Sequence, residues 1–132
     1  MVREITSTEE EKKLIQNAYR QLLRSIKKMD DTDRKNIRMA YELAVEAHSS
    51  QRRKSGEPYI LHPIAVARIC AEEIGLGPTA IVAALLHEVV EDTDVTYEQV
   101  KGGFGKEVAN GVLALTKNEQ LPNKKTQMDD RL

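Results

Sequence analysis

The amino-acid sequence predicts an all-α protein, a helical bundle. Three observations support this fold class: apolar residues recur at helical spacing almost throughout, the alternating apolar pattern of strands is missing, and aromatic residues make up only 4% of the chain. The 132 residues suffice for one domain with a hydrophobic core. We therefore expect a single helical domain.

Composition sets limits on partners and location. The net charge is -1, so nothing global attracts nucleic acid or a membrane, and any attraction for anions must be local. The single cysteine, Cys70, rules out an internal disulfide, fits a reducing cytoplasm and is predicted to be a small buried packing residue. The chain lacks both a run of 18 apolar residues and the apolar core of a secretion signal. We expect a cytoplasmic protein with no nucleic-acid or membrane partner.

The first two helices are predicted from caps and apolar stripes. Ser7, followed three residues later by Glu10, has the pattern of a capping box that opens a helix reaching about Met29. Its predicted apolar stripe is Leu14, Ala18, Leu22 and Ile26. The acidic run at residues 30–33 breaks this helix and caps a second, which ends near residues 49–50. The predicted buried face of the second helix is Ile37, Ala40, Tyr41, Ala44 and Ala47.

A loop over residues 51–63, QRRKSGEPYILHP, precedes the third predicted helix. Pro63 suits the first turn of that helix, and Gly75 ends it. Pro78 opens a fourth helix, PTAIVAALLHEVVED, which is apolar on nearly every side up to Leu86. Because a helix that is apolar all round must be covered all round, we expect this one at the centre of the bundle.

The last part of the chain is predicted to contain two more helices. Thr96 and Gln99 form a possible capping box for a short helix that ends before the glycines at positions 102 and 103. A strongly apolar helix follows over residues 106–115. From Thr116 the sequence turns polar and predicts a loop followed by the start of another helix. A chain that stops within such a turn is expected to be a fragment of something longer.

The end of the fourth predicted helix, LLHEVVEDTD, changes from apolar to acidic. Residues three and four apart are helical neighbours, so His87 meets Glu91, and Glu88 meets both Glu91 and Asp92. Carboxylates about 4 Å apart repel by about 4 kcal/mol near a protein surface, and the negative end of the helix dipole adds to the repulsion. A divalent metal held by His87 and an adjacent carboxylate would offset this charge. A hydrogen-bonded core histidine followed by solvated acids is the alternative, and this motif alone leaves both open.

The loop over residues 51–63 carries a second cluster. Arg52, Arg53 and Lys54 precede Ser55 and Gly56, a pattern suited to gripping phosphate, although a solvated basic loop is the simpler interpretation in isolation. His62, at a helix start, is either a cap-region residue or a ligand. Two histidines, an acidic cluster and a basic loop together favour hydrolysis of a phosphate ester or anhydride at a metal centre.

These two stretches resemble the hydrolase domain of the RelA/SpoT-type stringent-response enzymes, part of the HD metal-dependent phosphohydrolase superfamily. The match runs through AHSSQRRKSGEPYILHP (residues 47–63) and AALLHEVVEDT (residues 83–93), within a resemblance spanning roughly residues 36–117. It implies an HD-type helical bundle that binds one Mn²⁺ and removes the 3′-pyrophosphate from ppGpp and pppGpp. It further implies that the chain comes from a bifunctional enzyme with a covalently linked synthetase domain.

The resemblance also implies a role for each matching residue. The implied metal ligands are His62, His87 and Glu88; Glu91 and Asp92 match the acidic pair that activates and positions water; Arg53, Lys54 and Ser55 match the loop that holds the guanine nucleotide. His48 is implied to be structural. The single domain, residues 1–132, then divides into an N-terminal helix (1–33), an HD-like core (34–117) and the start of a further helical segment (118–132).

Two positions depart from the family pattern. Glu88 stands where the family has aspartate, and its extra methylene shifts the carboxylate in a kind of site that tolerates only about 0.5 Å of misplacement. The family also places a metal-binding aspartate in a later motif, K-L-A-D-R-x-x-N. Asp130 lies only 13 residues beyond Lys117, with no asparagine following, so we expect that ligand to be lost by truncation. A catalytically impaired nucleotide-binding or regulatory HD domain is therefore the alternative function, and an HD hydrolase of another nucleotide is a third.

Overall fold

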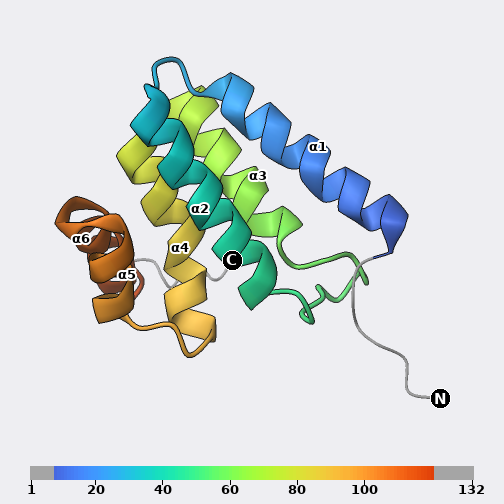
Figure 1. Ribbon diagram of the computed structural model, residues 1–132. Helices are drawn as coiled ribbons and strands as arrows, with labels where there is room; N and C mark the ends of the chain where they lie inside the picture. The colour runs from blue at the N-terminus through green and yellow to red at the C-terminus, as the bar shows by residue number, and fades with distance from the viewer. Residues whose placement is uncertain (1–7, 121–132) are drawn as a thin grey trace.

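The computed structural model describes residues 8–120, with only the backbone described for 116–120, and it is built from helices (Figure 1). The elements are α1 (Glu9–Ser25), α2 (Asp31–Ala47), α3 (Leu61–Ile69), the π-helical turn η1 (Cys70–Ile74), α4 (Pro78–Asp92), α5 (Tyr97–Phe104) and α6 (Lys106–Gln120). Within residues 8–120, the only strand-like feature is an isolated antiparallel bridge between Arg52 and Pro58. The all-α prediction is confirmed.

Helix α4 lies at the centre of the bundle, as its apolar sequence predicted. It contacts α2, α3 and α6, and Figure 1 shows α5 and α6 as a pair on one side of it. Its buried side chains are Ile81, Val82, Ala83, Leu85, Leu86, His87 and Val89. Burial on all these sides fixes the rotation of α4, so the direction in which its acidic end points is fixed by the core.

The N-terminal cap of α1 differs by one residue from the prediction. Thr8, rather than Ser7, is the N-cap: its side chain accepts a hydrogen bond from the backbone N–H of Glu11. The Glu11 carboxylate accepts one from the backbone N–H of Thr8 in return. The helix ends at Ser25, short of Met29. A run of threonine, serine and three glutamates allows several registers for a capping box, so sequence spacing did not determine which one forms.

The buried face of α1 is also rotated from the predicted stripe. Ile15 and Tyr19 are buried, whereas Leu14 is 55% exposed. Leu22 and Ile26 are buried as predicted. The sequence carries two overlapping stripes, and packing of α1 against α3 selects the one that includes Ile15 and Tyr19. Tyr19 stacks on Tyr41 of α2 with ring centroids 4.0 Å apart.

Helices α2 and α3 follow their predicted signals closely. Asp30 and Asp33 form the capping box of α2, and the helix ends at Ala47, a little before the predicted residues 49–50. Of its predicted buried face, Ile37, Ala40 and Ala44 are buried, whereas Tyr41 and Ala47 are half-buried. Pro63 lies in the first turn of α3, and Gly75, with φ of 79°, ends the π-helical turn that continues it. Cys70 is half-buried rather than fully buried.

Helices α5 and α6 are longer than predicted. Thr96 and Gln99 form the predicted capping box of α5, but the helix continues through both glycines to Phe104 and ends at Gly105, where φ is 98°. Helix α6 reaches Gln120, so residues 116–120 are helical rather than the predicted loop. Tertiary packing of α5 against α6 outweighs the weak helix propensity of glycine. The further helix predicted beyond this point lies outside the described residues.

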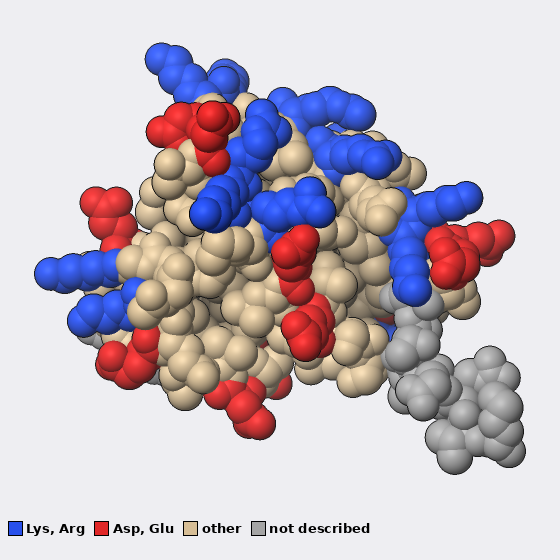
Figure 2. Space-filling view, in the orientation of Figure 1, with Lys and Arg blue, Asp and Glu red and all other residues tan. Residues whose placement is uncertain are grey.

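No helix in the described part of the chain is long and apolar enough to cross a membrane. Figure 2 shows Lys and Arg side chains mainly over the upper part of the visible face, with Asp and Glu side chains at its centre and edges.

The contact between α4 and α6 is close enough to require glycine. A Cβ atom on Gly111 would lie 2.9 Å from the Cβ of Ala83. We expect Gly111→Ala to destabilise the fold, because overpacking costs about 1–3 kcal/mol and outweighs a gain in helix propensity of about 1 kcal/mol. The free energy of unfolding from urea titration tests this. Gly102→Ala is the matched control: a Cβ there meets nothing within 4 Å, so it should stabilise α5. Equal effects of the two substitutions would contradict the prediction.

Candidate active site

The loop between α2 and α3 has a defined shape. The bridge between Arg52 and Pro58 closes it, and the Arg53 N–H donates to the carbonyl of Glu57 across 3.0 Å. Inside this closure the Gly56 N–H donates to the carbonyl of Arg53 across 2.8 Å, with a φ of 96° at Gly56 that favours glycine. The predicted phosphate-binding segment is therefore a folded turn whose backbone holds it in one conformation.

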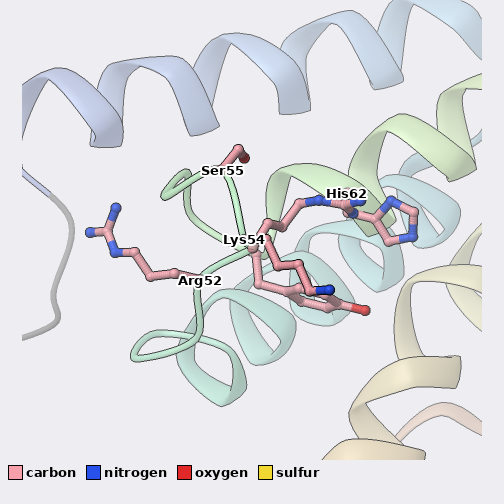
Figure 3. Close-up of a pocket in the computed structure, with 6 residues that line it drawn as sticks. Arg52, Lys54, Ser55 and His62 are labelled. Atoms are coloured by element: carbon pink, nitrogen blue, oxygen red, sulfur yellow. The ribbon is translucent and has the colours of Figure 1, made fainter.

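This turn forms one wall of a surface pocket of about 680 Å³. The pocket is lined by Arg52, Arg53, Lys54, Ser55, Tyr59 and His62. All three predicted nucleotide-binding residues thus share a pocket with one predicted metal ligand, His62. The volume lies within the range of roughly 300–1,000 Å³ typical of small-molecule sites. Figure 3 shows Lys54 extending on the same side as His62, whereas Arg52 points away from both.

The acidic end of α4 meets the start of α3 beside this pocket. The Nε2 atom of His62 lies 3.9 Å from an Oε atom of Glu88, which joins two predicted metal ligands from different helices. His87 is 7% exposed, and its Nε2 lies 3.4 Å from the Glu91 carboxylate, as helical spacing predicted. Glu91 and Asp92 are exposed, where water has access to them.

The donor chemistry of these residues fits a divalent metal. Carboxylates are ligands that suit Mn²⁺, and imidazole is a common ligand of divalent transition metals. In the described residues the donors stand as two histidine–carboxylate pairs, and no three His, Cys, Asp or Glu side chains there form a ready-made metal cluster. The predicted ligand set of His62, His87 and Glu88 stays a prediction.

Tyr59 is a site residue that sequence reasoning missed. Its hydroxyl donates a hydrogen bond to the Glu88 carboxylate. Its ring lies against the rings of His48 and His62, with centroids 5.0 Å and 5.8 Å away. Burial, followed by the bond to Glu88, raises the pKa of Tyr59, so the phenol keeps its proton and acts as a donor. The sequence did contain a signal for Tyr59: it is an aromatic residue within a polar loop, three positions before His62.

His48 is buried behind this tyrosine. It is 1% exposed, and its Nδ1 atom lies 2.7 Å from the side-chain oxygen of Gln51. In the described residues its Nε2 atom has no hydrogen-bond partner. These contacts support the structural role predicted for His48.

Arg52 has a different role from its two basic neighbours. Its guanidinium donates to both carboxylate oxygens of Glu11 in α1, across 2.7 Å and 2.8 Å, and to the carbonyl of Gly56 across 2.8 Å. This pairing lowers the pKa of Glu11 from 4.5 to about 2. No signal in the sequence connected these residues, which are 41 positions apart.

The lowered pKa predicts a particular dependence of stability on pH. The folded-state pKa of Glu11 lies below the ordinary value, so its stabilising effect is complete above pH 4.5 and is lost as the pH falls towards about 2. Urea titrations across this interval should show a smaller loss of stability for Glu11→Gln than for the natural chain. If the free energy of unfolding falls equally with pH in the two proteins, the lowered pKa of Glu11 is contradicted.

The fold and site place this chain in a family. The family model described as "HD domain" matches residues 40–131, more than half of the chain. The chain belongs to the HD-domain family.

Individual relatives carry more specific names. The chain is 48% identical over 94 residues, 71% of its length, to guanosine-3′,5′-bis(diphosphate) 3′-pyrophosphohydrolase of Aquifex aeolicus. It is 49% identical over 87 residues, 66% of its length, to the bifunctional (p)ppGpp synthase/hydrolase SpoT of Escherichia coli K12. The pyrophosphohydrolase MESH1 of Xenopus tropicalis is 46% identical over 96 residues, 68% of the chain. The chain spans 13%, 12% and 54% of these three proteins respectively.

Proposed function

We propose that this chain is the hydrolase domain of an enzyme that removes the 3′-pyrophosphate from ppGpp and pppGpp with Mn²⁺ as cofactor. The observation that carries the proposal is the shared pocket: Arg53, Lys54 and Ser55 line it together with His62, whose Nε2 is 3.9 Å from the Glu88 carboxylate. Relatives named as (p)ppGpp hydrolases, with identities of 46–49%, support the choice of nucleotide.

The basic turn is the part of the site that binds phosphate. Arg53 and Lys54 are exposed and line the pocket, where their cationic groups can meet a pyrophosphate. The Nε atom of Arg53 also lies 3.9 Å from the Glu57 carboxylate, which competes with the phosphate for it. Ser55 adds a hydroxyl beside them. A nucleotide seated here has its phosphates next to His62, at the side of the pocket that faces α4.

His62, His87 and Glu88 would hold the metal, which when bound supplies Lewis acidity that lowers the pKa of water. Glu91 or Asp92, both exposed at the end of α4, orients the attacking water or accepts its proton. The water oxygen bonds to the phosphorus attached at the 3′ oxygen, and the bond between that phosphorus and the 3′ oxygen breaks. The 3′ oxygen leaves and takes up a proton, so the products are pyrophosphate and GDP (from ppGpp) or GTP (from pppGpp). Arg53 and Lys54 offset the charge of the pyrophosphate group.

We further propose a cytoplasmic enzyme in which a synthetase domain is covalently linked to this one. The Escherichia coli relative named as a bifunctional synthase/hydrolase supports such a partner domain. Glu88 in place of aspartate favours an impaired, regulatory domain instead. The names of the relatives favour an active hydrolase.

Release of pyrophosphate tests the proposal. The 132-residue chain and the full natural reading frame should be incubated with ppGpp and Mn²⁺, with chelator-treated protein and Glu91→Gln as controls. We expect hydrolysis that requires the metal, is lost in the Glu91 variant and does not occur with ordinary nucleoside triphosphates. A full reading frame that releases no pyrophosphate overturns the active-enzyme proposal, and equal cleavage of GTP overturns the choice of substrate.

A further inference from the structure

We propose that Glu11 of α1 is a positioning residue for the nucleotide-binding turn: it clamps Arg52 and so holds Arg53, Lys54 and Ser55 in their place on the pocket wall. The inference rests on the proposed function for the identity of the nucleotide. The order of the turn itself is independent of any ligand.

The ion pair between Glu11 of α1 and Arg52 of the turn is bidentate and partly buried. Both carboxylate oxygens of Glu11 accept from separate nitrogens of Arg52, across 2.7 Å and 2.8 Å. The side chains are 22% and 25% exposed, whereas those of the surface pair Arg38–Glu42 are 59% exposed or more. A forked arginine–carboxylate pair fixes orientation as well as distance, and partial burial limits screening by salt.

The Arg52 guanidinium also forms a hydrogen bond within the turn. One of the Arg52 nitrogens that binds Glu11 also donates to the carbonyl of Gly56 across 2.8 Å. Gly56 lies immediately after the predicted ligand Ser55. Glu11 orients Arg52, and Arg52 in turn secures the far side of the turn through Gly56.

Apolar packing and a cavity also lie between this end of α1 and the loop. A second cavity, of about 400 Å³, lies between them. Ile15 and Gln16 of α1 line it, and so do Pro58 and Ile60 at the end of the loop. Ile15 and Ile60 are both buried in the core, so the ion pair adds a polar contact to the apolar packing between α1 and the end of the loop.

Glu11 is also part of the capping box of α1. Its carboxylate accepts from the backbone N–H of Thr8 across 3.0 Å while it binds Arg52. The helix cap thereby orients the carboxylate towards the loop. Figure 3 shows the side chain of Arg52 extending away from Lys54 and His62, although Arg52 also lines the pocket. Arg52 therefore acts on the nucleotide through the turn.

The test compares Glu11→Gln with Glu10→Gln, an exposed glutamate in the same helical turn. Hydrogen exchange is measured at the amides of Arg53, Gly56 and Tyr59, whose hydrogen bonds define the loop. We expect faster exchange at these amides in Glu11→Gln and unchanged exchange in Glu10→Gln. Equal exchange in both variants overturns the inference.

Kinetics with ppGpp and Mn²⁺ separate positioning from general destabilisation. Glu11→Gln should raise KM by about tenfold, below the roughly 100-fold that a 1 Å misplacement can cost, with kcat nearly unchanged. The double variant Glu11→Gln/Arg52→Gln should be no worse than Arg52→Gln alone, because one contact is lost in both. If the increase in KM of the double variant equals the two single increases combined, the inference is overturned.

Failure of the proposed function gives a different result. A natural chain that does not bind ppGpp, combined with a loosened turn in Glu11→Gln, overturns the proposed nucleotide and supports the clamp. Tight ppGpp binding with an unchanged KM in Glu11→Gln supports the nucleotide and overturns the clamp.

Discussion

His62→Gln is expected to weaken manganese binding by more than the roughly 10–100-fold that loss of a residue supporting a metal ligand typically costs, and to abolish pyrophosphate release. His62 lies at the start of α3, with its side chain 35% exposed and its Nε2 3.9 Å from the Glu88 carboxylate. Glutamine removes the imidazole while retaining a polar side chain, so the bundle should remain folded. Titration of Mn²⁺ followed by electron paramagnetic resonance measures the affinity without relying on turnover.

His48→Gln is the matched control. His48 is also an imidazole next to Tyr59, but it is buried and bound to Gln51. Its replacement should lower the melting temperature and leave manganese affinity nearly unchanged. If His62→Gln binds manganese as well as the natural chain does, His62 is not a ligand.

Glu88→Asp is expected to increase manganese affinity by about 10–100-fold. The Glu88 carboxylate accepts a hydrogen bond from Tyr59, which competes with any metal for the same oxygens. Hydrogen bonds to charged groups contribute about 1.5–3 kcal/mol, and 1.4 kcal/mol is tenfold in affinity. Removing one methylene withdraws the carboxylate by about 1.5 Å and weakens this competition. Isothermal titration with Mn²⁺ measures the change.

Two further variants distinguish the effect of the Tyr59 hydrogen bond on manganese affinity from the effect of shortening an acidic side chain. Tyr59→Phe deletes the hydroxyl and keeps the ring, so it should reproduce much of the gain. Glu91→Asp makes the same one-carbon deletion in the carboxylate that pairs with His87, and it should give no gain. Unchanged affinity in Glu88→Asp would instead show that glutamate suffices at this position.

Much of the fold could be predicted because its signals are local. The apolar run of α4 and Pro78 at its start identified the central helix, and Thr96 with Gln99 identified the cap of α5. The pairing of His87 with Glu91 followed from helical spacing alone. These features depend on residues a few positions apart, for which the geometry of one helix is sufficient.

Other features depended on tertiary packing. Contact with α3 selected the buried face of α1, so Leu14 is exposed and Ile15 is buried. Helix α5 continues through its two glycines against α6. The buried face of α1 depends on which of two overlapping stripes meets α3, and α5 forms because packing against α6 outweighs the cost of about 1 kcal/mol for each helical glycine.

For the candidate site, the chemical groups could be read from the sequence alone: two histidines, a run of carboxylates and a basic turn, in a pattern that matches a known family. Which of these groups come into contact depends on how the helices pack. In the folded chain His62 lies beside Glu88, Tyr59 donates a hydrogen bond to Glu88, and Arg52 on the pocket wall binds Glu11 of α1. These partners are 26, 29 and 41 positions apart, and contacts over such separations exist only after the helices have packed.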